Sequence, residues 1–281
     1  MSLCFYAPGA DSNETLAVDR VQAAVASTLP LPLGAVAFVT RHTALRYVRG
    51  YPGDVDGAVK SLLQTAEWRV LNVPRGVARS CVACGLNAES HCIVPLGPTR
   101  LGSPLLYMSA PRARNLVTED CVEHLVEALE KSFSDEAEVG EEVYKAGAWI
   151  FDGRGYTVLA GAMNPSVGIA YARTLQSHFP ERLGRCLLVD VNWAFSVFWR
   201  LVRPFLATAT ADKILSINGR AALAASLEEL QATEAQCAWV LEAYDLEALP
   251  GNLPSWPLPE GSPKMGTLTP CPAKGLKKEN N

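Results

Sequence analysis

Two cysteines three positions apart, followed by a histidine and another cysteine, are the residues of this chain whose types and spacing could bind a metal ion. They are Cys81 and Cys84, then His91 and Cys92. Four thiolate and imidazole ligands are typical of tetrahedral zinc. The adjacent pair is awkward as a ligand set, because neighbouring side chains usually diverge. Two interpretations stay open: a structural zinc, with no other cofactor required, or cysteines that are free or serve only in packing.

Two glycine-containing motifs could indicate enzymatic chemistry, but both are incomplete. Gly153-Arg-Gly155 follows an apolar run, as in a dinucleotide fingerprint, yet Val158 stands where the third glycine belongs. Asn164-Pro-Ser166-Val-Gly168 lacks the first glycine of a serine-hydrolase elbow, and no histidine follows His178. We therefore expect a protein that is not an enzyme, with an α/β hydrolase as a remote alternative.

A glutamate occupies a sharp turn between a predicted helix and an apolar run. Pro180 to Gly184 ends the helix, and Glu181 lies within that turn. Its carboxylate could point inward and accept hydrogen bonds from a ligand. It could equally cap the turn or pair with Arg182 or Arg185. The spacing alone leaves both interpretations open.

The stretch from Asn192 to Leu206 is rich in aromatic residues and carries only two charges, Arg200 and Arg203. Because apolar residues lie all round a helix through this stretch, the helix needs burial on more than one side. A helix that covers an apolar cavity and can enter a bilayer fits this pattern, and so does a central core helix. Its large apolar side chains include Trp193, Phe195, Phe198, Trp199, Val202 and Phe205.

The elements that must position these residues alternate between short apolar runs and helical patterns. Residues 118–132 have an acidic start and apolar residues at helical spacing, which predicts an amphipathic helix. Apolar runs separated by helices are typical of strands in a mostly parallel sheet. The runs expected as strands are 104–109, 148–151, 186–191 and 214–217.

The rest of the chain suggests four segments with different patterns. Residues 19–71 have mostly helical spacing, whereas 75–102 carry Gly, Pro, Cys and Ser with no period. The end of the chain is rich in proline and lysine, which is typical of disorder. We predict a helical module at 15–74, a cysteine-containing connector at 75–103, an α/β domain at 104–250 and a disordered tail at 251–281.

Composition narrows the classes of function. The 281 residues are 49% hydrophobic, with a net charge of −4. That charge argues against nucleic acid as a partner. The longest apolar stretch, 29–39, is broken by prolines and is too short to span a bilayer. Eight scattered cysteines and no expected secretory signal predict a cytoplasmic protein with reduced thiols. The apolar surplus indicates either a ligand cavity or a generous core.

Two segments resemble a known family. The segment from His178 to Ile214 contains HFPERLG, an apolar run, an aromatic helix with PFL, and then TADKI. It closely resembles the core signature of the CRAL-TRIO lipid-binding family, of the phosphatidylinositol-transfer-protein type. A second segment, with LRYVRG at 45–50, GDVDGAV at 53–59 and TAEWR at 65–69, is similar to that family's N-terminal helical module. Together the resemblance covers roughly residues 15 to 250.

The resemblance implies an α/β fold in which a helical subdomain precedes a mostly parallel β-sheet cup, with the lipid cavity covered by the aromatic helix as a gate. It implies that Glu181, Thr210 and Lys213 contact an inositol phosphate headgroup, for which such groups are suitable partners. Gly147 and Trp149 stand where phosphatidylcholine binders of the family have Ser and Thr, so the resemblance does not imply choline recognition. The ligand favoured by the matches at the other three positions is phosphatidylinositol.

The function implied is lipid transfer. One phospholipid, or another hydrophobic ligand, would be held in a closed cavity and exchanged at membranes. We expect a monomeric protein that contacts membrane surfaces transiently. The alternative is a scaffold or regulatory CRAL-TRIO module that keeps the fold and leaves the cavity unused.

Overall fold

The computed structural model describes residues 10–28, 38–73, 80–133, 145–157, 165–254 and 262. Most of the tail predicted to be disordered, and Asn164 and Val158 of the incomplete motifs, lie outside these residues. Within the described part of the chain, none of the helices is both long enough and apolar enough to cross a bilayer.

A five-stranded sheet forms the centre of the molecule, in the order β1-β2-β3-β4-β5. β1 runs antiparallel to β2, and the other pairs are parallel. The mostly parallel sheet predicted from the apolar runs is therefore confirmed. The strands are β1 (Ile93–Pro98), β2 (Pro104–Met108), β3 (Gly147–Asp152), β4 (Leu183–Val189) and β5 (Ile214–Ile217).

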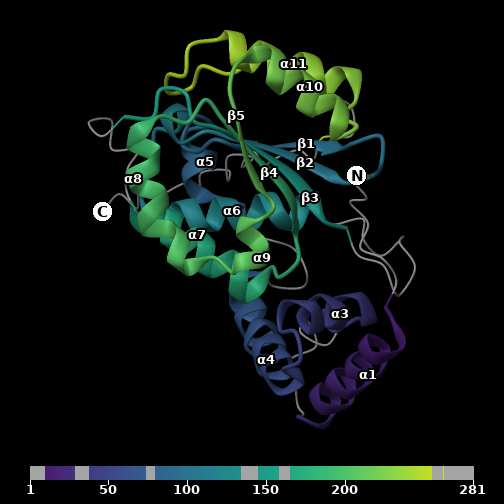
Figure 1. Cartoon of the computed structure of the whole chain (residues 1–281). Coiled ribbons are helices and arrows are strands. Elements are labelled where there is room, and N and C mark those ends of the chain that lie inside the picture. Colours follow the sequence, from purple (N-terminus) through teal and green to yellow (C-terminus); the bar gives the residue numbers. More distant parts are fainter. Residues whose placement is uncertain are drawn as a thin grey trace, which may run out of the picture.

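Helices cover both faces of this sheet (Figure 1). One face carries α10 (Arg220–Glu229) and α11 (Glu234–Asp245). The other face carries α6 (Thr118–Ser132) and α7 (Pro165–His178), with α8 (Trp193–Val202) beside them. The shorter helical segments are α5 (Val82–Leu86), α9 (Thr208–Ala211) and the 3-10 turns η2 (Ala110–Arg112) and η4 (Arg203–Phe205).

Alternation along the strands divides the core between the two faces. In β3, Ala148 and Ile150 pack toward α10 and α11, whereas Trp149 packs toward α6. In β4, Leu187 belongs to the first cluster and Cys186 to the second. Both faces of the central strands are therefore buried, which explains why they appear in the sequence as continuous apolar runs.

Strand β1 occupies a segment for which the sequence predicted no regular structure. Pro95 and Pro98 lack a backbone N–H, Gly97 has no side chain to pack, and together they break any alternation. The register with β2 shifts between Pro95 and Pro98, and Gly97 has a φ of 80°. An edge strand tolerates such residues because only one of its sides is paired within the sheet. The prediction of an irregular connector was wrong for these residues.

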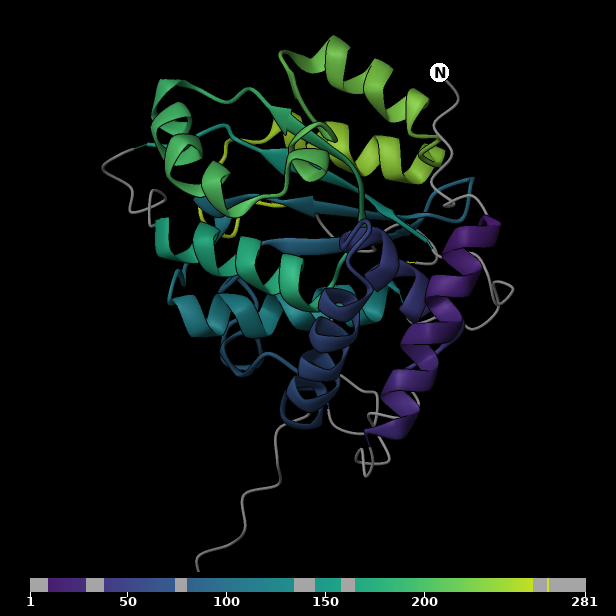
Figure 2. The same cartoon turned by 60° about the horizontal axis from the view of Figure 1, so that its bottom comes forward.

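Among the described residues, the N-terminal helices α1 (Ser12–Ser27), α3 (Arg41–Gly50) and α4 (Val55–Asn72) form a separate layer at one end of the molecule. They share a small apolar core of their own. Glu14 closes a capping box with Asp11 at the start of α1 and also binds Arg49 of α3, at 2.8 Å. α4 contacts α7, so this layer is attached on the α6–α7 side of the sheet (Figure 2).

Candidate functional site

Helix α8 begins at a well-defined cap directly after β4. The Asn192 side-chain oxygen accepts hydrogen bonds from the backbone N–H groups of Ala194 and Phe195, at 3.0 and 3.2 Å. Its amide nitrogen donates to the carbonyl of Tyr156, at 2.7 Å. This cap satisfies the first free N–H groups of the helix and ties its start to the turn after β3. The aromatic stretch is therefore helical from Trp193 onward, as the sequence predicted.

The inner face of α8 packs into an aromatic cluster. Phe195 is buried, and its ring centroid lies 5.2 Å from that of Phe151 and 5.5 Å from that of Phe198. Trp199 stacks on Phe195 at 6.3 Å, and Val202 is also buried. These side chains hold α8 against the sheet face that carries α7.

Helices α7 and α8 approach closely at one glycine. A Cβ atom at Gly168 would lie 2.4 Å from Cζ of Phe198 and 2.8 Å from Cγ2 of Val202. Glycine at this position therefore lets α8 lie directly on α7. Farther along, the guanidinium of Arg173 in α7 covers the ring of Phe205 at 5.0 Å. The position of α8 thus depends on α7 as well as on the sheet.

The outer face of α8 is apolar but uncovered. Trp193, Val197 and Leu201 are 73%, 44% and 49% exposed. They are four residues apart, so they lie along one stripe of the helix. The sequence predicted that the helix would need burial on more than one side, and the structure covers the inner side only. Val197 and Leu201 were not among the predicted gate residues, although their spacing from Trp193 could have revealed the stripe.

Glu181 and Lys213 meet at the end of the sheet where β4 and β5 begin. Glu181 lies in the turn before β4, and Lys213 directly precedes β5, the parallel neighbour of β4. The Lys213 ammonium lies 3.1 Å from a Glu181 carboxylate oxygen, and both side chains are about a quarter exposed. The structure shows an ion pair with Lys213, a partner that neither interpretation of Glu181 named. Thr210, three residues before Lys213, is half-buried, and its carbonyl accepts a hydrogen bond from the N–H of Lys213.

The turn that carries Glu181 is held by the N-terminal helices. Glu181 itself has a φ of 59°, a left-handed conformation that is unusual for a residue with a side chain. The neighbouring carbonyl of Pro180 accepts a hydrogen bond from the buried Arg46 of α3, at 3.3 Å. Gly50 lies so close that a Cβ there would be 3.1 Å from Cβ of Pro180. Contacts from α3 therefore help to fix the backbone that positions the Glu181 carboxylate.

Three of the four predicted metal ligands come together on the α6 side of the sheet, and a different histidine joins them. Ligand atoms of Cys81, Cys84, His91 and His124 all lie within 4.8 Å of one another. Cys92 is not part of the group, so the predicted ligand set is corrected to one containing His124. Cys92 packs instead in the core beneath α10 and α11.

Extended backbone explains the exclusion of Cys92. Successive side chains leading into β1 point to opposite faces, so Cys92 and the adjacent His91 diverge. Burial raises the pKa of the Cys92 thiol to about 12, which keeps it protonated. His124 was missed because it is 33 positions beyond His91 along the chain. The signal that could have found it is helical spacing, since Cys121, His124, Leu125 and Ala128 share the buried face of α6.

Comparison with known proteins finds a family model, two relatives and a solved structure that are similar to this chain. A family model described as "CRAL/TRIO domain" matches residues 88–237, just over half of the chain. A CRAL-TRIO domain-containing protein of Schizosaccharomyces pombe is 30% identical over 183 residues, which are 63% of this chain and 17% of that protein. The phosphatidylinositol transfer protein PDR17 of Saccharomyces cerevisiae is 25% identical over 187 residues, 63% of this chain and 52% of that protein. The chain thus spans about half, or less, of the length of these relatives.

A solved structure shows the same fold. The crystal structure of Sfh5 matches with a TM-score of 0.56 at 13% identity, covering 75% of this chain and 82% of that one. At this level of identity the likeness concerns the arrangement of helices and strands alone.

Proposed function

The chain belongs to the CRAL/TRIO domain family, and from that premise we propose that it binds one phospholipid, with phosphatidylinositol favoured, and exchanges it at membrane surfaces. Similarity to a phosphatidylinositol transfer protein supports this class of ligand. The observation that carries the proposal is that α8 is apolar on both its inner and its outer face.

A helix that only completed a core would need one apolar face. Single exposed apolar residues are common on protein surfaces and need no explanation. Here Trp193, Val197 and Leu201 form a continuous stripe on the face opposite the buried Phe195 and Val202. Such a stripe can enter the apolar part of a bilayer while the inner face covers the acyl chains. The exposed Arg200 on the same helix would meet anionic headgroups, which contributes about 1 kcal/mol per basic residue at the surface.

The headgroup site in this proposal is the Glu181–Lys213 pair. A phosphate is a stronger partner for an ammonium than a partly exposed carboxylate, because it offers several charged oxygens. The inositol phosphate would therefore take Lys213 as its partner, with the Thr210 hydroxyl as a further donor. Glu181 would then accept hydrogen bonds from inositol hydroxyls. Since about a quarter of both charged side chains is exposed, a headgroup can reach them.

Exchange must take place at a membrane for energetic reasons. Two acyl chains of about sixteen carbons each, at about 0.8 kcal/mol per CH₂, represent on the order of 20 kcal/mol of hydrophobic transfer. Release into water against that free energy would be too slow to serve transfer. We propose that α8 moves away from α7 when its outer stripe enters a bilayer, so that the lipid passes directly between the bilayer and a cavity closed by this helix.

Native mass spectrometry of the full chain tests the proposal. The protein is purified, incubated with vesicles of phosphatidylcholine with or without phosphatidylinositol, and separated from them. We expect one lipid per chain, with the phosphatidylinositol adduct dominant when both lipids are offered, and transfer of labelled phosphatidylinositol between vesicles. A chain that stays without lipid in every vesicle mixture and transfers none would overturn the proposal in favour of a scaffold whose cavity is unused.

A further inference from the structure

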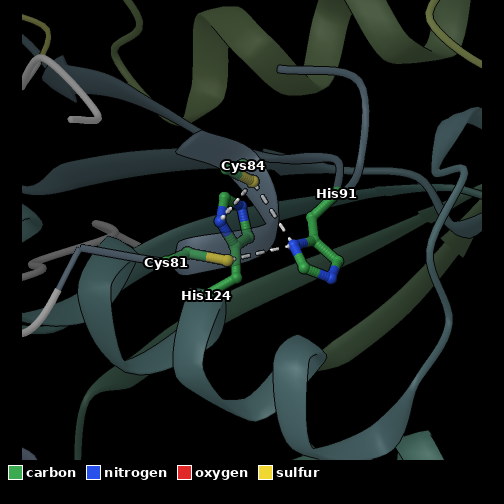
Figure 3. Close-up of side chains that lie close together, drawn as sticks. All are labelled: Cys81, Cys84, His91 and His124. Carbon is green, nitrogen blue, oxygen red and sulfur yellow. Dashed lines mark hydrogen bonds between the residues drawn. The ribbon is translucent and has the colours of Figure 1, made fainter. Parts of the chain in front are cut away.

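A cluster of two cysteines and two histidines lies between α5, α6 and the segment that leads into β1. We propose that Cys81, Cys84, His91 and His124 bind one zinc ion, which fastens the α5 segment to α6 and to the sheet. Figure 3 shows the four side chains converging from these three parts of the chain. The proposal does not depend on lipid binding.

The distances in the cluster are close to those of a tetrahedral zinc site. With Zn–S near 2.3 Å and Zn–N near 2.0–2.1 Å, a sulfur and a nitrogen bound to the same ion are about 3.6 Å apart. Nδ1 of His91 lies 3.4 Å from Sγ of Cys81 and 3.3 Å from Sγ of Cys84. Nδ1 of His124 lies 3.4 Å from Sγ of Cys84. Small outward shifts would therefore accommodate an ion at the centre.

The protonation of His124 is suited to a metal ligand. Its Nε2 lies 3.0 Å from the carbonyl oxygen of Ile93. A carbonyl can only accept, so the proton of the neutral imidazole is on Nε2, and the lone pair is on Nδ1, which faces Cys84. Histidines that bind metals commonly donate their other N–H to a carbonyl in this way, which fixes both tautomer and ring orientation.

Hydrogen bonds among the four side chains alone satisfy the cluster poorly. Nδ1 of His91 offers either one N–H or one lone pair, yet two sulfur atoms lie within 3.4 Å of it. It can therefore make a good hydrogen bond with one of them only. A cation at the centre would contact all four ligand atoms at once. Two thiolates and two imidazoles in tetrahedral arrangement favour zinc among the common metals.

The surroundings indicate what the ion would do. No side chain of α5 is buried, and Val82 and Leu86 are 56% and 84% exposed, so apolar packing contributes little to holding this segment. The N–H of Cys81 donates to the buried carboxylate of Glu127 in α6, at 2.8 Å, and Ser90 donates to the carbonyl of Ala83 at 2.9 Å. All four positions around the ion would be protein ligands, which is typical of a structural rather than a catalytic zinc.

Metal analysis of the full chain, with matched cysteine variants, tests the site. Protein purified from zinc-supplemented cells should contain about one zinc per chain by elemental mass spectrometry. Cys84→Ser and His124→Gln should each reduce the zinc content at least roughly tenfold. Cys237→Ser, the same change in a cysteine of α11, should leave it unchanged. Cys92→Ala should also leave it unchanged, because this residue lies outside the cluster. Zinc loss in Cys92→Ala with retention in His124→Gln would overturn the ligand set.

A spectroscopic measurement on the wild-type chain covers the case in which the ligand variants do not fold. After removal of zinc by a chelator, the melting temperature should fall and should return when zinc is added, because the ion binds only the folded state. Titration with Co²⁺ should give the visible bands of tetrahedral cobalt and a thiolate charge-transfer band, at one equivalent. Wild-type protein that is purified without metal and gives no such bands with Co²⁺ would overturn the proposal.

Discussion

The indole of Trp68 in α4 lies flat against the imidazole of His178 at the end of α7, with ring centroids 4.1 Å apart and planes inclined by 8°. Nδ1 of the same histidine is 3.0 Å from the hydroxyl of Thr65, and that hydroxyl donates to the carbonyl of Ser177 at 2.9 Å. This contact joins the N-terminal helices to the α/β part, three residues before Glu181. The contacts that hold the backbone of the proposed headgroup site therefore include the ionisable imidazole of His178.

The stability of this contact should depend on pH. Burial, with the positive charge of Arg69 as a smaller cause, lowers the pKa of His178 to about 4, from about 6.5 in an unfolded chain. Between these pH values the unfolded state binds the proton and the folded state does not, so acid favours unfolding. We expect the free energy of unfolding to fall by about 1–2 kcal/mol as pH decreases from 6.5 to 4, the ring being only partly buried.

Urea denaturation at several pH values between 7 and 4 measures this effect. The variant His178→Gln should be less stable at pH 7, since it loses the stacked ring, but its stability should fall less steeply in acid. The same pH dependence in the wild type and in His178→Gln would show that the proton binds elsewhere.

The ion pair between Glu181 and Lys213 gives a prediction about headgroup binding. Lys213→Ala should weaken binding of phosphatidylinositol by about 1.5–3 kcal/mol, the range for a hydrogen bond to a charged group. Loading with an uncharged sterol should change little, and so should the melting temperature, because solvent-accessible ion pairs such as this one contribute about 0–1 kcal/mol to stability.

Arg220→Ala is the control for Lys213→Ala. It removes the ion pair at 2.8 Å between Arg220 of α10 and Asp245 of α11, and should leave both ligands unaffected. Binding of each lipid is measured by native mass spectrometry or by a displacement assay. Equal losses of phosphatidylinositol and sterol in Lys213→Ala would indicate damage to the fold and not a headgroup contact.

The sequence predicted the features that depend on neighbouring residues and missed those that depend on contacts between segments far apart in the chain. Strands β2 to β5 and helix α6 were predictable because their burial leaves a pattern in the local sequence. A strand buried on both faces is a continuous apolar run, such as 148–151, and a helix buried on one face has apolar residues at helical spacing. Strand β1 was not predictable, because its prolines and glycine are untypical of a strand and its extended conformation depends on pairing with β2. Helical spacing places His124 on the buried face of α6, but only the packing of α6 beside α5 brings it to Cys81. The division of α8 into inner and outer faces likewise depends on where α7 lies.

The contact between α7 and α8 gives a prediction about the gate. Gly168→Leu would place a side chain where Phe198 and Val202 now lie, and should push α8 away from α7. Replacing glycine within a helix gains about 1 kcal/mol of helix propensity, so α7 itself should persist. We expect faster tryptic cleavage after Arg200 and faster lipid transfer between vesicles. Gln176→Leu, at an exposed position of the same helix, is the control. Cleavage and transfer at wild-type rates in Gly168→Leu would mean that α8 does not move against α7.

The outer stripe of α8 provides the last prediction, because it separates membrane contact from stability. Trp193 is the first residue of the helix and is 73% exposed. An aspartate there would favour the helix through its dipole and would remove no core contact, so stability should change by less than about 0.5 kcal/mol. Inserting an exposed indole into lipid contributes about 1.5–3 kcal/mol, and this gain would be lost. We therefore expect Trp193→Asp to reduce vesicle binding and lipid transfer by about tenfold or more.

Leu16→Asp, a comparable change at a residue of α1 that is 63% exposed, should leave both unchanged. Phe195→Asp, on the buried face, should instead destabilise the protein, as seen in its melting temperature. Transfer by Trp193→Asp at the wild-type rate would show that lipid exchange does not require the outer face of α8.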